Sequence, residues 1–246
     1  MIISLAAKKS HLTVYLAMLL NFLLLAGCAR ASDTDGLYLR TAFAFNQIES
    51  TTFYLHGDQI AWNPKGGVDP FDFAAAEKSE PANVGHFKIN GDQMEITWGG
   101  GRAAQSLKIE RQNGKMSALD GGLVSKVGSY SNDQKLDATF GGVMLAGGEG
   151  GITGGRTITF AKDGHFSTAT LATAELNPNV AGGTGSVASD NSGTYTLSGN
   201  TLTLNFAGGK TEKHTVFPYN TSTDPANAKL DDEKLFYDTF QLARER

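Results

Sequence analysis

The chain has few of the residues on which several classes of protein depend. It contains one cysteine, Cys28, so no disulfide can form within one molecule. It has only five histidines, and none stands at the close spacing of a metal-binding pair. No Gly-x-Ser-x-Gly motif is present, and no serine has a recognisable histidine and aspartate partner. We therefore predict no catalytic residues, no metal site and no cofactor.

The charge of the chain, its lack of a long helical pattern and its glycine-rich stretch exclude further classes of protein. The 21 basic and 25 acidic residues give a formal net charge of −4, and the basic residues form no stripe. Nucleic acid is therefore not a predicted partner, because its phosphates need such a stripe.

No long helical pattern is present after the N-terminal apolar run, and the nearest approach to one is the short stretch 73–78. The glycine-rich stretch 141–155 lacks the Gly-Lys-Ser/Thr of a phosphate-binding loop, and we interpret it as a flexible hairpin connection.

The N-terminal residues have the composition of an export signal. An apolar run over 12–24 follows Lys8 and Lys9 and ends in the sequence Leu-Ala-Gly-Cys at positions 25–28. A basic flank, a short apolar stretch and small residues before a cut define a secretory signal, and the run is shorter than the ~20 residues of a membrane-spanning helix.

The four residues Leu25-Ala26-Gly27-Cys28 resemble the lipobox of bacterial lipoproteins. The resemblance implies that the thiol of Cys28 is lipidated and that the chain is cut just before it. Residues 1–27 would then be a signal peptide and residues 28–35 a lipidated tether. The predicted location is outside the cytoplasm, anchored to the bacterial cell membrane through the lipid on Cys28. In a Gram-negative cell the non-acidic Ala29 favours the outer membrane.

The rest of the chain contains an internal repeat. The segment GHFKINGDQMEITW at 85–98 matches GTYTLSGNTLTLNF at 193–206 with a constant offset of 108 residues. In each copy apolar and polar residues alternate on both sides of a turn glycine, Gly91 or Gly199. Alternation with period two is typical of a strand with one buried face, and Asn-Gly favours a tight hairpin turn. The repeated unit is therefore predicted to be a β-hairpin.

Further hairpin patterns surround each copy, and together they predict an all-β fold. We expect an antiparallel barrel or sandwich of about ten strands, built from two repeated units. We assign residues 36–111 to the first unit, 112–135 to a connection and 136–246 to the second unit, and we favour packing of the two units as one body. The paired hairpins with a Gly-x-aromatic turn motif resemble the lipocalin-like domains of bacterial exported lipoproteins, which implies a ligand-carrying role.

Candidate binding residues lie in a long connection of the first unit. Residues 63–84 contain the sequence Asp69-Pro70-Phe71-Asp72-Phe73, which offers two aromatic rings and two carboxylates in a short span. Long loops on a rigid scaffold often carry binding residues. We take Asp69, Phe71, Asp72 and Phe73 as candidates for ligand binding.

Three functions remain open at this point. The preferred one is a cell-envelope lipoprotein that acts as a non-catalytic binding or interaction module, with an envelope protein as its partner. A lipocalin-like carrier of a small apolar ligand is the first alternative, because a closed barrel of eight strands can enclose one. An enzyme whose site is assembled across the fold is the second.

Overall fold

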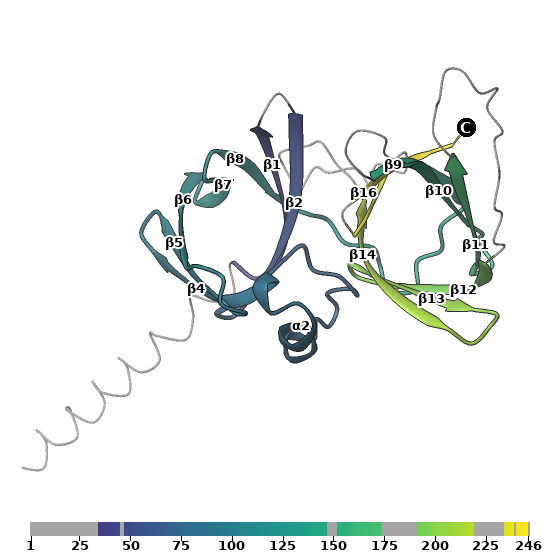
Figure 1. The fold of residues 1–246 in the computed structure, drawn as a ribbon, viewed down its shortest axis with the longest axis horizontal. Coiled ribbons are helices and arrows are strands. Elements are labelled where there is room, and N and C mark those ends of the chain that lie inside the picture. The colour runs from purple at the N-terminus through teal and green to yellow at the C-terminus, as the bar shows by residue number, and fades with distance from the viewer. Residues whose placement is uncertain are drawn as a thin grey trace, which may run out of the picture.

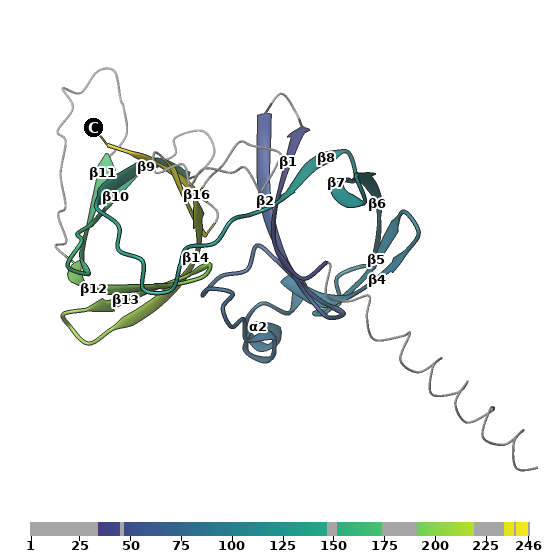
Figure 2. The same cartoon turned by 180° about the vertical axis from the view of Figure 1, so that it is seen from behind.

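The computed structural model describes residues 34–44, 47–146, 152–173, 191–218, 234–238 and 240–245. Within these residues the chain forms sixteen β-strands, where about ten were expected, together with one α-helix and one 3-10 helix. The strands form two closed antiparallel barrels of eight strands each. The barrels lie side by side (Figure 1), and the view from behind shows the same arrangement (Figure 2). The prediction of an all-β fold built from two repeated units is confirmed.

The first barrel is an up-and-down meander in which β8 pairs with β1 to close the ring. Its strands are β1 (Gly36–Ala44), β2 (Gln47–His56), β3 (Gln59–Trp62), β4 (Val84–Asn90), β5 (Gln93–Trp98), β6 (Gln105–Gln112), β7 (Lys115–Leu119) and β8 (Gly122–Lys126). The connection between β3 and β4 carries the helices α2 (Phe73–Ser79) and η1 (Pro81–Asn83).

The second barrel repeats this topology, and β16 pairs with β9 to close it. Its strands are β9 (Ala138–Ala146), β10 (Ile152–Phe160), β11 (His165–Thr173), β12 (Asn191–Ser198), β13 (Thr201–Phe206), β14 (Thr211–Pro218), β15 (Lys234–Tyr237) and β16 (Phe240–Arg244).

The structure corrects the predicted end of the first unit. We assigned residues 112–135 to a connection, but β7 and β8 lie there and complete the first barrel. Tight turns at Asn113-Gly114 and Asp120-Gly121 join these strands, and φ is positive at all four residues. Each strand has only five residues, which leaves too few positions for an alternation to stand out. The Asn-Gly and Asp-Gly pairs are the sequence signal that would have revealed them.

The glycine-rich stretch 141–155 is also more ordered than we expected. β9 runs through it to Ala146, and β10 begins at Ile152. Glycine leaves room for the neighbouring β16, because a Cβ atom at Gly142 would lie 2.7 Å from a methyl of Leu242 and 3.2 Å from the carbonyl oxygen of Gln241. The interpretation as a flexible connection is therefore wrong for most of this stretch.

The repeat is preserved in the strand register. Gly85 pairs with Trp98 across β4 and β5, and Gly193 pairs with Phe206 across β12 and β13, at the same offset of 108. The turn glycines Gly91 and Gly199 have φ of 61° and 57°, as the hairpin prediction requires. The two hairpins are therefore copies of one unit in pairing as well as in sequence.

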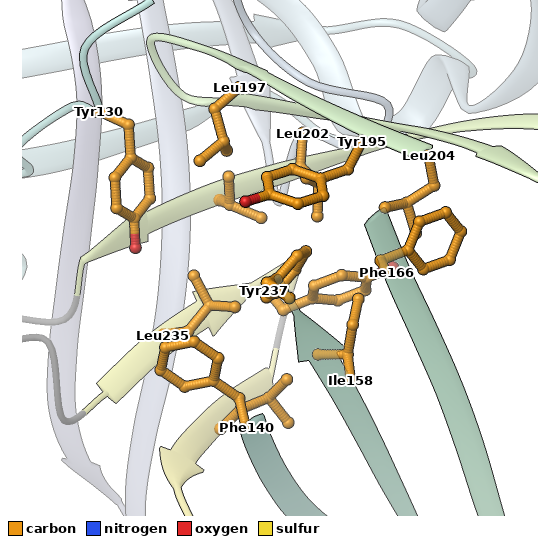
Figure 3. Packing of buried hydrophobic residues seen from close by; sticks show 13 residues of the cluster. Tyr130, Phe140, Ile158, Phe166, Tyr195, Leu197, Leu202, Leu204, Leu235 and Tyr237 are labelled. Atoms are coloured by element: carbon orange, nitrogen blue, oxygen red, sulfur yellow. The ribbon is translucent and has the colours of Figure 1, made fainter. Parts of the chain in front are cut away.

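Each barrel is filled by its own apolar cluster. In the second barrel, side chains from opposite walls point toward one another (Figure 3), and Tyr195, Leu202 and Leu204 are at most 1% exposed. The first barrel contains the equivalent cluster around Phe53, Met94 and Ile96. Since both interiors hold large side chains, packing inside each barrel supplies most of its buried apolar surface.

A third cluster lies between the barrels. Leu37 and Leu39 on the outer face of β1 pack with Val68 of the β3–α2 loop and with Phe217 and Phe236 of the second barrel. The rings of Phe217 and Phe236 are stacked with centroids 4.5 Å apart. These five side chains are each at most 5% exposed, so the barrels share a continuous apolar contact.

Candidate functional site: an aromatic groove beside the first barrel

The loop between β3 and α2 reaches the second barrel through hydrogen bonds. The hydroxyl oxygen of Thr201 accepts from the backbone N–H groups of Val68 and Asp69, both at 2.9 Å. Thr215 accepts from the N–H of Gly67 at 3.2 Å and donates to the carbonyl of Pro64 at 2.8 Å. We call these four hydrogen bonds the clasp. Thr201 and Thr215 are 6% and 0% exposed, so the clasp is shielded from water.

The clasp depends on a close approach at Gly67. A Cβ atom there would collide with the Thr201 side chain, and the φ of Gly67 is 84°. Only glycine satisfies both constraints without strain. Gly67 therefore allows the loop to lie against β13. No local sequence pattern reveals this role.

Among the four predicted residues, Asp69 faces the second barrel. Its carboxylate accepts a hydrogen bond from the backbone N–H of Asn200, in the turn after β12. The Asn200 side chain in turn donates to the carbonyls of Gly128 and Val216, at 2.8 and 3.1 Å. Asp69 thus joins the loop of one barrel to the repeated hairpin turn of the other.

Phe71 and Phe73 line an open groove beside the first barrel, with Asp72 between them. The groove has a volume of about 530 Å3 and lies between the end of the β2–β3 hairpin and the start of α2. Its lining residues are His56, Gln59, Pro70, Phe71, Asp72, Phe73 and Ala74. Figure 1 shows α2 outside the barrel wall, on the side toward the second barrel.

Three aromatic rings hold the groove in shape. The Phe71 and Phe73 rings meet edge to face, with centroids 4.7 Å apart. Tyr54 on the outer face of β2 contacts both, at 5.9 Å from Phe71 and 6.1 Å from Phe73. All three rings are half-buried, and Tyr54 and Phe71 also pack against the apolar cluster between the barrels. The groove is therefore continuous with the barrel contact.

Asp72 has a structural role at the edge of the groove. Its side chain accepts a hydrogen bond from the backbone N–H of Ala75 at 2.9 Å and caps the N-terminus of α2. The cap sets where the helix begins and thereby places Phe73, its first residue, against Tyr54.

Negative charge surrounds these rings. His56 contacts Asp35 through Nδ1 at 3.1 Å, and Asp35 also accepts from the N–H of Gly57. The pKa of Tyr54 is raised, first by burial and then by the charges of Asp69 and Asp35. Both carboxylates therefore act on the ring that supports the groove.

Sequence reasoning missed the residues of the groove that come from the β2–β3 hairpin. Tyr54, His56 and Gln59 lie in an alternating strand pattern, where nothing distinguishes an outer-face residue that meets a loop from one that meets water. Thr201 and Thr215 were missed for a related reason, because they lie more than 130 residues from their partners. The loop sequence itself pointed to Phe71 and Phe73, but not to the contact of Asp69.

Another polar cluster surrounds His214 in the second barrel. Its Nδ1 lies 2.8 Å from an Asp238 oxygen, its Nε2 lies 3.2 Å from a Glu212 oxygen, and its ring packs on Tyr237. Lys210 contacts Glu212 at 2.6 Å. Across the part of the chain that the structure describes, no three His, Cys, Asp or Glu side chains are grouped so that they could hold a metal ion.

Cys28, the predicted lipidation site, lies outside the described residues. Within the ranges that begin at residue 34 and end at residue 245, no helix has the length and apolar character that crossing a membrane requires.

Comparison with known proteins bears on the second barrel. A family model described as a lipocalin-like domain matches residues 127–223. The match begins in the connection between the barrels, where Tyr130 is buried in the second core, and extends past the end of β14. No curated protein and no solved structure shows a significant match to the chain. With the shared register of the two barrels, this match supports a duplicated, lipocalin-like β-domain.

Proposed function

We propose that this protein is a lipid-anchored, non-catalytic binding module of the bacterial cell envelope, and that the aromatic groove is its binding site. The lipobox-like sequence at Cys28 supports the anchor and the location. The lipocalin-like match supports ligand binding in general, because closed eight-stranded barrels often hold small ligands.

One observation favours the groove over the barrel interiors. Large side chains such as Phe53 and Tyr195 occupy the interiors and are at most 1% exposed. By contrast, Phe71 and Phe73 are only partly buried and stand beside an open volume of about 530 Å3. Partly buried aromatic rings around a concave surface are typical of a small-ligand site.

The second candidate is a carrier that holds a small apolar ligand inside the second barrel. The lipocalin-like match favours this function. A ligand there must displace or reorganise the cluster around Tyr195 and Leu204, whereas a ligand in the groove leaves both cores intact. The two candidates therefore differ in which residues respond to a ligand.

The test is titration of the 15N-labelled mature chain with an apolar aromatic probe, N-phenyl-1-naphthylamine, followed by amide chemical shifts. We expect shifts at residues 54–59 and 70–74, and a loss of affinity of about tenfold in Phe73→Ala, which removes one ring from the site. Phe43→Ala is the matched control, because Phe43 is 74% exposed at the opposite end of β1–β2. Shifts confined to core residues of the second barrel would favour the carrier instead.

A further inference from the structure

The charged residues at and near the groove make its surroundings negative. Among the described residues that line it, none is Lys or Arg, whereas Asp72 contributes a carboxylate. Asp69 stands next to the lining residue Pro70 and acts on the supporting ring of Tyr54. The groove thus combines aromatic rings with the carboxylate of Asp72, and the carboxylate of Asp69, which accepts from Asn200, lies nearby.

The charges of Asp69 and Asp72 are not cancelled by the hydrogen bonds described above. Asp69 accepts from the backbone N–H of Asn200, and Asp72 accepts from the backbone N–H of Ala75. Both donors are neutral. A cation nearby on the same connection, Lys65, instead contacts Glu80 at 2.8 Å.

His56 adds no net positive charge to the groove. Its Nδ1 contacts Asp35 at 3.1 Å, so when the imidazole is protonated the Asp35 carboxylate balances it. When the imidazole is neutral, the Asp35 charge remains. In either state the surroundings of the groove are negative.

We propose that the groove selects a small organic cation with an apolar group, such as a substituted ammonium ion, over neutral and anionic ligands of the same size. This inference rests on the proposed function, since it names the ligand class of the same groove. A cation over the face of an aromatic ring is attracted by the ring quadrupole. Phe71 and Phe73 line the groove with their rings only partly buried, and Asp72 beside them adds a full opposite charge. The apolar part of the ligand would cover the remaining ring surface.

The experiment compares three ligands of similar size by amide chemical shifts: benzyltrimethylammonium, N,N-dimethylbenzamide and phenylacetate. We expect benzyltrimethylammonium to bind about tenfold more tightly than the neutral amide, with shifts at His56, Gln59 and residues 70–74. Phenylacetate should bind most weakly, because the carboxylates repel it.

Two variants separate the charge from the rings. Asp72→Asn removes the charge but retains a side chain that caps a helix equally well, so it should weaken the ammonium ion about threefold and leave the amide unchanged. Phe73→Leu keeps apolar surface and removes a ring, so it should weaken the ammonium ion by about three- to tenfold. Asp92→Asn, in the exposed β4–β5 turn, changes the net charge equally and is the control.

Each other outcome has a definite meaning. If the amide binds as tightly as the ammonium ion, the charge inference is overturned and the proposed binding groove stands. If Asp92→Asn weakens the ammonium ion as much as Asp72→Asn does, the preference comes from net charge and the inference is again overturned. If none of the three ligands shifts the groove residues, both this inference and the proposed function fail.

Discussion

Replacement of Thr201 by valine tests whether the two barrels stabilise each other. The Thr201 hydroxyl accepts the N–H groups of Val68 and Asp69, and valine keeps the shape of the side chain while removing that oxygen. Each buried N–H left without an acceptor costs about 1–3 kcal/mol. Since the loop can relax toward water, we expect about 2–4 kcal/mol to be lost from the contact between the barrels.

The assay uses the uneven distribution of tryptophan. The chain has two tryptophans, Trp62 and Trp98, and both lie in the first barrel, whereas Thr201 lies in the second. Urea unfolding followed by tryptophan fluorescence therefore reports on a barrel that does not contain the substitution. With a slope of about 1–3 kcal/mol per molar urea, we expect the fluorescence midpoint to fall by about 1 M or more.

Thr203→Val is the matched control. Thr203 lies two residues further along β13 on the same face, opposite Thr196 and Lys213, and its replacement should move the fluorescence midpoint little. The reasoning would be refuted if Thr201→Val lowered the stability seen by circular dichroism while tryptophan fluorescence kept its wild-type midpoint. The barrels would then unfold independently, and the clasp would not couple them.

Three further predictions concern single residues. Gly91→Ala should lower the free energy of unfolding in urea by about 1–2 kcal/mol, because φ is positive at this residue. Gly199→Ala should lower it more, because the new Cβ would also meet the carboxylate of Asp69, and equal losses would contradict this. The pKa of Glu212 is lowered, first by a hydrogen bond from Lys210. The ionised carboxylate therefore stabilises the fold, so Glu212→Gln should lower the free energy of unfolding at pH 7, and the loss should shrink toward pH 3 as the carboxylate becomes protonated. An equal loss at the two pH values would contradict this prediction. Cys28→Ser should abolish metabolic labelling with a fatty acid, and labelling equal to wild type would exclude the anchor.

The parts of the fold that the sequence predicted are those that local physics determines. Alternation around Gly91 and Gly199 identified both repeated hairpins, because period-two burial and a turn at positive φ leave few other structures. β7 and β8 were missed although turns at Asn-Gly and Asp-Gly bound them, since each has only five residues. Leu119 and Val124 do reach the core, but this becomes apparent only once β8 pairs with β1 and closes the ring. Local patterns carry no information on such closure.

The candidate site could be predicted only in part. Phe71 and Phe73 stood out because two aromatic residues in a polar loop are unusual. Their partner Tyr54 belongs to a strand, and the groove exists only because α2 returns against that strand. Contacts between residues far apart in the chain depend on the assembled fold, so composition and spacing cannot specify them.

The clasp and the groove lie where the two copies of the unit differ. The equivalent turns at Gly91 and Gly199 have the same backbone conformation, yet the space around Gly91 is open while Gly199 abuts Asp69. The connection after β3 carries α2, one wall of the groove and three of the four donors of the clasp. Thr201 in β13 and Thr215 in β14 accept from these three, and Thr215 donates the fourth bond to the carbonyl of Pro64. An isolated second barrel would expose Thr201, Thr215 and Phe217 to water. The duplication thus supplied two similar scaffolds, and the long connection of one copy made both the contact between the barrels and the groove beside it.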